Sequence, residues 1–350
     1  MGALDTLFKS VFRDYNTDGV PASGNKNTDK SDCRGIGAQI ESYVFAQCPP
    51  GGRLTLTSGA PVLGSSSVSG ANTVYYTPYI GNMVPVWNGT IWVPTVFSEV
   101  SQLTTDATKS PAAAAINSLY DIFVWSDAGT IRATRGPAWS SQTARGTGAG
   151  TTELTRSAGL IVNKYAVTNG PAASYGLYVG TIFCGGSAAV DWVPAPTAAN
   201  GGAYCALLIW NMFNRDEALA SVQDNTSYTL TASGYRAAHG STNNRIYFVT
   251  GFAEDAIAIS YNSLTTTAAT AGSYTQVSLG LDSASSQING QFAQNNTTQN
   301  ASQAISQNLS LSAAPQLGWH YVQAIEQGDG SHANTFNSGS NALLQIKLRM

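Results

Sequence analysis

Six carboxylates of the chain could in principle supply the acid and base of a glycoside hydrolase: Asp191, Glu217, Glu254, Asp255, Asp282 and Glu326. The two groups of such a pair must lie about 5–10 Å apart in a cleft. Glu254 and Asp255 are adjacent on an expected strand, so their side chains should point to opposite faces of a sheet. Asp216 and Glu217 lie at the end of an expected helix, where solvation is the ordinary role of a charge. We therefore expect no glycan hydrolysis and no other enzyme activity.

The three histidines, His239, His320 and His332, are far apart in the sequence. A metal site needs a cluster of ligands, and sequence separation alone leaves that question open. His320 lies between Trp319 and Tyr321 on an expected strand, so we interpret it as a packed ring. The chain carries neither a Gly-x-Ser-x-Gly motif nor a P-loop. We expect no metal and no cofactor.

The four cysteines form two local pairs, Cys33 with Cys48 and Cys184 with Cys205, and neither pair has the spacing of a zinc site. One interpretation is four free, buried thiols. The other is oxidation. A bond between Cys184 and Cys205 would close a loop of about 20 residues and stabilise the fold by roughly 3 kcal/mol.

Tryptophans could stack on sugars. Trp87 and Trp92 flank an Asn88-Gly89 turn, so we expect them to pack against each other across a hairpin. Trp139 lies in a loop rich in Gly, Ser and Thr, and we expect it to be exposed. It is therefore our candidate contact for a host-surface glycan.

Charge is scarce in this sequence. Only 11% of the 350 residues are charged, against about 25% in an average protein. The formal net charge of −3 gives no basic face for nucleic acid. No run of about 18 apolar residues predicts a transmembrane segment, and Leu4 to Phe12, which is interrupted by Lys9, is not a signal peptide. A neutral surface of this kind suits broad contacts between copies of the chain.

Residues 1–52 predict an arm rather than part of the main body. Apolar residues follow helical spacing at Leu4, Leu7, Phe8, Val11 and Phe12. An isolated helix of this length is marginal in water, so it needs a partner surface. A loop-rich linker and a second short helix, about 31–47, follow before CPPGG ends the region. The arm either docks on another protein or packs against its own body.

Residues 53–350 predict a mainly β body, a β-sandwich of jelly-roll type. Hairpins are expected at 83–94, which turns at Asn88-Gly89, and at 121–134, which turns near 127–129. Residues 204–220 are the exception. They are almost continuously apolar from Cys205 to Phe213, and we predict one buried helix there. Residues 283–312 are rich in Ser, Gln and Asn and predict a surface excursion or an arm that reaches a neighbour.

The chain from Arg53 to Glu326 resembles a family of tailed-bacteriophage virion structural proteins, described as tail, collar or fibre-like. The motifs that carry the resemblance are, in order, GRLTLTSGAPV, TVYYTPYIGNMVPVWNGTIWVPTVFSEVS, LLIWNMFNR, GFAEDA, GLDS and GWHYVQAIE. The opening LFKSVFRDYNTDGVPASGNKNTDKSD resembles the segment that attaches some phage fibres and spikes to the particle. Its core is Asp18-Gly19-Val20-Pro21 with Ser23-Gly24, whereas Cys33 and Cys48 are not part of that pattern.

The resemblance implies a structural protein of the virion, assembled in the host cytoplasm and extracellular after release. It implies a homotrimer whose arm docks on other virion proteins of the neck, the tail or the region next to the portal, and it implies no catalytic residues. In such a particle, Cys33 with Cys48 and Cys184 with Cys205 could be oxidised after release. The alternatives are a fibre that binds a receptor or glycan and, less favoured, a glycan depolymerase.

Overall fold

The computed structural model describes residues 35–37, 40, 49–339 and 341–350. Of the second helix expected near 31–47, the described residues 35–37 and 40 are helical. The apolar stripe of the arm, from Leu4 to Phe12, lies outside the described residues, and so do Cys33 and Cys48. No helix in the described part of the chain is long and apolar enough to span a membrane.

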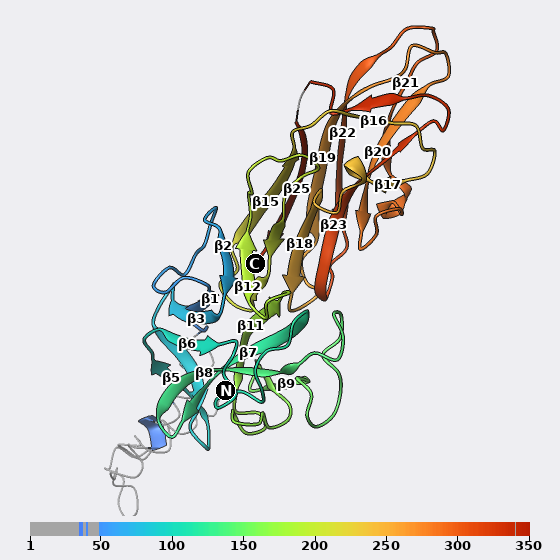
Figure 1. Ribbon diagram of the computed structural model, residues 1–350. Coiled ribbons are helices and arrows are strands. Elements are labelled where there is room, and N and C mark those ends of the chain that lie inside the picture. The colour runs from blue at the N-terminus through green and yellow to red at the C-terminus, as the bar shows by residue number, and fades with distance from the viewer. Residues whose placement is uncertain (1–34, 38–39, 41–48, 340) are drawn as a thin grey trace, which may run out of the picture.

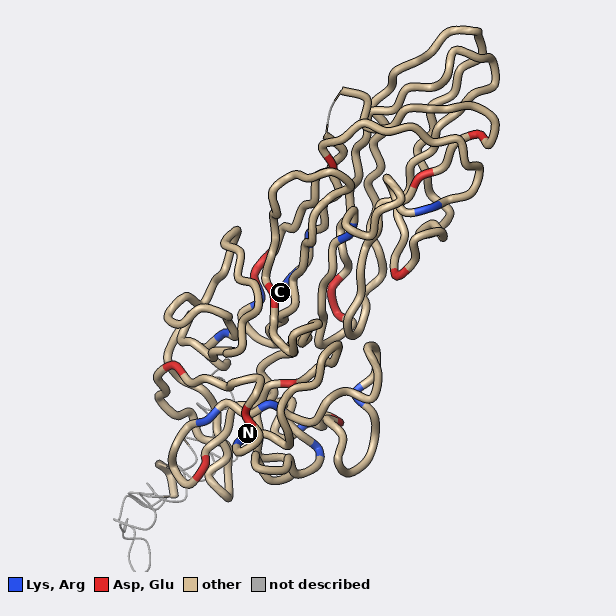
Figure 2. Tube along the Cα trace, in the orientation of Figure 1, with Lys and Arg blue, Asp and Glu red and all other residues tan. Residues whose placement is uncertain are grey.

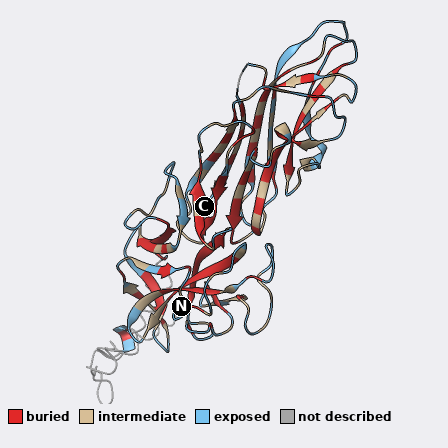
Figure 3. Ribbon diagram, viewed as in Figure 1, coloured by how far each residue is buried: buried red, intermediate tan, exposed pale blue. Residues whose placement is uncertain are grey.

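The part of the chain that the structure describes is mainly β, with several antiparallel sheets and almost no helix (Figure 1). The body is elongated. Strands from the first half of the chain gather at one end, and strands from the second half extend to a narrow tip. Two short 3-10 helices, η1 (Ala238–Gly240) and η2 (Ile288–Gly290), interrupt the strands. Buried residues run through both halves of the body (Figure 3).

Three sheets make up most of the first half. The strand bounds are β1 (Gly52–Thr55), β3 (Thr73–Pro78) and β6 (Val100–Leu103); β4 (Met83–Trp87) and β5 (Trp92–Val96); β7 (Ser118–Asp127), β8 (Thr130–Ala138), β9 (Leu154–Ser157), β10 (Leu160–Asn163), β11 (Leu177–Cys184) and β14 (Ile209–Asn211). The sheet orders are β1-β3-β6, β4-β5 and β8-β7-β11-β10-β9, with β14 paired to β11.

Two sheets, one of eight strands and one of six, make up most of the second half. The first contains β2 (Val68–Ala71), β12 (Val190–Val193), β13 (Cys205–Leu207), β17 (Arg236–Ala237), β18 (Arg245–Thr250), β20 (Tyr274–Leu281), β21 (Phe292–Asn296) and β23 (Gly318–Gly328). The second contains β15 (Glu217–Asp224), β16 (Tyr228–Leu230), β19 (Ile257–Thr266), β22 (Ala304–Ala313), β24 (Asn334–Phe336) and β25 (Ala342–Arg349). Their orders are β2-β12-β13-β18-β23-β20-β21, with β17 on β23, and β15-β25-β19-β24-β16, with β22 on β19. Among these strand pairs, β13 with β18 is parallel.

The interior between the two sheets of the second half is apolar at one end and polar at the other. The inward positions of β19 are apolar at Ile257 and Ile259 but polar at Ser263 and Thr265, and all four are buried. The Thr275 hydroxyl on β20 donates to the Thr265 hydroxyl at 2.8 Å, a direct contact between the two sheets. Because each buried hydroxyl needs a partner, this end of the interior is held by hydrogen bonds as well as by packing.

Both predicted hairpins are confirmed. β7 turns into β8 through Ala128 and Gly129, whose φ angles of 48° and 92° are those of a two-residue type I′ turn. β4 pairs with β5 so that Trp87 lies opposite Trp92, and their rings meet edge to face at 5.8 Å. This second turn is longer than expected. It spans residues 88–91 because the Asn88 side-chain oxygen accepts hydrogen bonds from the amides of Thr90 and Ile91.

The predicted helix at 204–220 is wrong. Its apolar run forms β13 and β14, and Glu217 begins β15. A short apolar run does not distinguish a helix from a strand that is buried on both faces. Here the run pairs with distant strands, β13 with β12 and β18 and β14 with β11. Asn211, the one polar residue of the run, accepts the Leu54 amide with its side-chain oxygen at 2.6 Å. At Leu208 the chain passes from the sheet of β13 to the sheet of β14, so this segment joins the two halves of the body.

The expected excursion at 283–312 is also corrected. β21 pairs with β20, and β22 pairs along the whole of β19, from Ala313 opposite Ile257 to Ala304 opposite Thr266. The segment is therefore an edge of the body. Its polar composition fits strands that bury one face against a polar interior, as the burial of Gln307 shows.

Candidate functional site

The carboxylates considered for catalysis already bind local partners. Glu254 and Asp255 lie in a loop rather than on the expected strand, and both accept ion pairs from Arg215, at 2.8 and 2.5 Å. Glu217 pairs with Lys347 at the surface. Charged residues are sparse along the described body (Figure 2). The prediction that Glu254 and Asp255 lie on opposite faces of a strand is wrong. Instead, both carboxylates hold their loop against Arg215.

Asp282 and Asp191 also bind neighbours. Asp282 accepts a contact from His320 Nδ1 at 2.6 Å and the Tyr321 amide at 3.0 Å. His320 is 4% exposed, which confirms the packed ring expected from its neighbours. Asp191 accepts the Gly70 amide at 2.7 Å and the Tyr204 hydroxyl at 2.8 Å.

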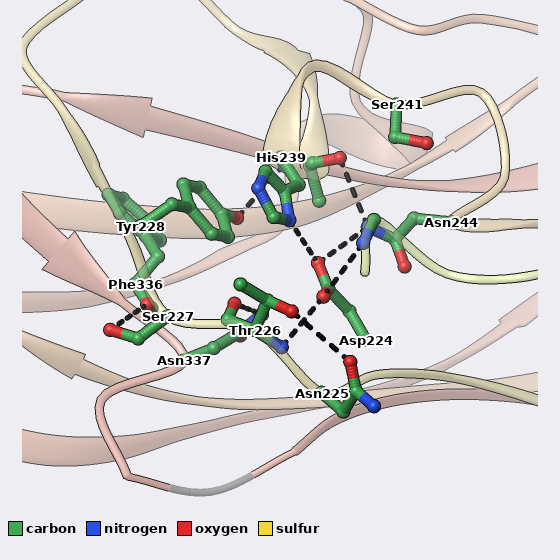
Figure 4. A network of polar contacts seen from close by, with 12 residues as sticks. Asp224, Asn225, Thr226, Ser227, Tyr228, His239, Ser241, Asn244, Phe336 and Asn337 are labelled. Atoms are coloured by element: carbon green, nitrogen blue, oxygen red, sulfur yellow. Dashed lines mark hydrogen bonds and ion pairs between the residues drawn. The ribbon is translucent and has the colours of Figure 1, made fainter. Parts of the chain in front are cut away.

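Asp224 and His239 form the arrangement that most resembles catalytic machinery (Figure 4). His239 Nδ1 lies 2.8 Å from one oxygen of the fully buried Asp224 carboxylate, and the His239 ring stacks on Tyr228 at 3.9 Å. An imidazole oriented in this way can serve as a general base if a nucleophile reaches its other nitrogen. Ser241 does not, because its side chain points away from His239 and its hydroxyl accepts the Asn243 amide.

The same network holds loops together. Asp224 accepts the amides of Gly201 and Thr226 and the side-chain amide of Asn244, at 3.0, 3.1 and 3.2 Å. These partners come from three separate segments. The network therefore fixes the loops that follow β15 and precede β18. Holding these loops is a structural role that accounts for the contacts of Asp224.

Glu326 lies beside this network and is fully buried. It binds the Tyr228 hydroxyl, the His239 amide at 3.0 Å and the Arg236 guanidinium at 3.0 and 3.1 Å. Burial outweighs these donors and raises the pKa of Glu326 to about 7. In the sequence Glu326 is only one of several candidate carboxylates, because its partners come from distant parts of the chain.

Trp139, our candidate glycan contact, is not exposed as expected. It is 6% exposed and lies under the Arg145 guanidinium, whose carbon is 4.3 Å from the ring centroid. Arg145 also lies over the rings of Phe252 and Tyr178, at 4.9 and 5.3 Å, and pairs with the buried Asp121 at 2.7 Å. The residues rich in Gly, Ser and Thr around Trp139 therefore belong to a loop that folds over a buried ion pair.

Cys184 and Cys205 are free, buried thiols, so the bond between them is not formed. Cys184 ends β11 and Cys205 begins β13, in two different sheets, and the Cys205 thiol donates to the Pro194 carbonyl at 3.5 Å. Burial raises the pKa of each thiol to about 12.

We expect neither thiol to react with an alkylating reagent at neutral pH in the folded protein, because the thiolate is the reactive form. The variant to measure carries Cys33→Ser and Cys48→Ser, so that intact mass counts only Cys184 and Cys205. Both should be labelled after denaturation. Labelling of either at the denatured rate under native conditions would contradict the buried, free state.

A groove lined by aromatic rings lies where the two halves of the body meet. It has a volume of about 360 Å³, and its aromatic walls are Phe183, Tyr204, Tyr247 and Trp319. Trp319 is stacked between Phe183 at 5.2 Å and Tyr247 at 5.5 Å. The sequence does not reveal this groove, because residues 204–220 predict a buried helix and the other rings lie on three separate strands.

Strand register explains how the rings come together. β18 and β23 are antiparallel, with Tyr247 opposite Tyr321, and Tyr321 meets Tyr247 and Trp319 edge to face at 6.0 and 6.1 Å. Alternation puts Trp319 and Tyr321 on the outer face, whereas His320 faces inward. Gly318 lets a loop approach this strand, since a Cβ there would lie 2.0 Å from the Gln142 carbonyl, the group that accepts the Trp319 amide.

No family model matches the chain, and no curated protein matches it. Among solved structures, it is similar to a Bacillus thuringiensis Cry1Da tryptic core variant at 8% identity, over 79% of this chain and 48% of that chain. The chain thus spans about half the length of that protein. The TM-score is 0.16, so the similarity carries no argument about fold or function.

Proposed function

We propose that this chain is a non-enzymatic structural protein of a tailed-phage virion, which docks through residues 1–52 on other virion proteins of the neck or tail. The elongated body is the observation that favours this function. Gly52, where the arm joins the body, begins β1 in the half opposite the tip (Figure 1). A body whose arm leaves from the half away from the tip can be held on a particle while its tip points outward.

The finer fold belongs to the same proposal. The two sheets of the second half face each other through the contact between Thr265 and Thr275, and we interpret them as a β-sandwich of jelly-roll type. A homotrimer is the favoured assembly, because a surface with so few charges suits contact between copies. Particle attachment also gives the apolar stripe of the arm the partner surface that a short amphipathic helix needs.

Deletion of residues 1–50 tests the attachment. We expect the truncated body to be absent from purified particles while it remains folded, as judged by circular dichroism. A sharper variant replaces Leu4, Leu7, Phe8, Val11 and Phe12 with alanine. Its matched control replaces Asp5 and Lys9, which lie off the apolar stripe, and should still be incorporated.

Two outcomes would contradict the proposal. Truncated protein in particles at the wild-type level would show that the arm is not the attachment. A truncated body that is monomeric by light scattering would remove the trimer, because the contacts between copies are assigned to the body.

A further inference from the structure

We propose that the groove between the two halves of the body is a saccharide-binding site. Its wall of stacked rings, Phe183, Trp319 and Tyr247, ends at Tyr204, which is 44% exposed. Its volume of about 360 Å³ is at the lower end of the range for small-molecule sites, about 300–1,000 Å³. The site does not depend on the virion assignment, since it rests on groups that the purified protein carries.

The groove also offers hydrogen-bonding groups beside its aromatic rings. Asn117 and Gln142 line it and are exposed, and among the described residues their side-chain amides have no hydrogen-bond partner. An apolar ligand would displace water from these amides without replacing its hydrogen bonds. A sugar ring presents C–H groups on its faces and hydroxyls at its edge, so it can contact the exposed Tyr204 ring and the two amides together.

Arg245 extends the site beyond Tyr247. Its guanidinium lies 3.7 Å above the Tyr321 ring and 5.6 Å from the Tyr247 ring. Nε donates to the Gln323 side chain at 2.8 Å, and Nη1 donates to the Tyr247 hydroxyl at 3.3 Å. Nη2 has no partner among the described residues. Because the other nitrogens hold the group in place, Nη2 can donate to a sugar oxygen at little further cost in side-chain entropy.

Two features hold the exposed ring at the mouth of the groove. The Tyr204 hydroxyl donates to Asp191, and the Tyr204 ring lies 5.8 Å from Tyr247. Burial and the nearby Asp191 carboxylate raise the pKa of Tyr204, so the phenol keeps its proton. The ring is therefore positioned before a ligand arrives.

Calorimetric titration of the full chain tests the site. The probes are three soluble oligosaccharides: a neutral hexose oligomer, an N-acetylhexosamine oligomer and a uronic acid oligomer. We expect at least one to bind with a millimolar or tighter Kd. Tyr204→Ala and Arg245→Gln should each weaken binding about tenfold, the effect of losing one good contact.

Two variants at exposed positions test the site with less risk of misfolding. Gln142→Ala removes an exposed amide, and Asn117→Gly keeps the positive φ of 52° while removing the other. Each should weaken binding several-fold with an unchanged melting temperature. Phe292→Ala, which removes an aromatic ring 47% exposed on β21, is the control and should bind as wild type does.

Three results would overturn the site. The first is no binding of any probe at millimolar concentration. The second is binding that is unchanged in Tyr204→Ala, Arg245→Gln and the two amide variants. The third is that wild type binds no probe and that Tyr204→Ala changes the oligomeric state. That result would make the groove a contact between copies of the chain.

Discussion

Asp121→Ala is expected to lower the free energy of unfolding by about 3–5 kcal/mol, because it leaves a buried guanidinium without its counterion. Asp121 is fully buried and accepts Arg145 Nε at 2.7 Å and Arg145 Nη2 at 3.2 Å. The hydroxyls of Thr152 and Thr181 fill its remaining acceptor positions, at 3.1 and 2.7 Å. Arg145 in turn donates to the Gly251 carbonyl at 2.7 Å. The ion pair therefore ties β7 and β11 to the loop that follows β18.

Chemical denaturation of Asp121→Ala and Asp127→Ala side by side measures this effect. Asp127 pairs with Arg132 at a similar distance, 2.6 Å, but the two side chains are 43% and 31% exposed. A pair in water contributes at most about 1 kcal/mol. Equal losses in the two variants would show that burial of the Asp121 pair does not set its strength.

The stability of the protein should fall by roughly 3 kcal/mol as the pH rises from about 4.5 to about 7, through Glu326 alone. Burial raises the pKa of Glu326 to about 7 in the folded protein, whereas an unfolded glutamate titrates near 4.5. Between these values the unfolded chain has released the proton that the folded chain still holds. The unfolded state then binds fewer protons, so each rise in pH favours unfolding.

Outside this window Glu326 contributes no pH dependence. Below about pH 4.5 the carboxyl is protonated in both states, and above about pH 7 it is ionised in both. Arg236, Tyr228, His239 and Asp224 also lie in this region, and they remain in place in Glu326→Gln. The difference between wild type and Glu326→Gln therefore isolates the carboxyl.

Urea denaturation of wild type and Glu326→Gln at several pH values from 4 to 8 measures that difference. We expect Glu326→Gln to lose less stability across the window. The control is Glu217→Gln, whose side chain is 63% exposed and paired with Lys347, and it should follow the wild-type curve. Parallel curves for all three proteins would show that Glu326 is already ionised in the folded state at low pH.

Local chemistry predicted the hairpins because a tight turn is specified by the residues within it. Ala128 and Gly129 adopt the positive φ angles of the expected turn, and Trp87 meets Trp92 across the other hairpin. The same local information did not predict β13 and β14. Their strand conformation depends on pairing with β12, β18 and β11, strands that the run itself does not specify.

The groove was only partly visible in the sequence. Trp319 and Tyr321 are two residues apart on a predicted strand, and so are Arg245 and Tyr247, so each pair could be placed on one face. That these two faces adjoin is decided by the pairing of β18 with β23, which no turn between them specifies. Trp139 shows the opposite error, since its polar surroundings predicted exposure and Arg145 covers it.

The sequence by itself determined a mainly β protein, because alternation and turn residues act over a few neighbours. It also determined which side chains were available, from the scarce charges to the many aromatic rings. Only the tertiary structure decided which of them meet: Asp121 with Arg145, Glu326 with Arg236, and Tyr204 with Tyr247. The physical reason is that burial and partners set the state of a polar or aromatic group, and both come from strands that are distant in the chain.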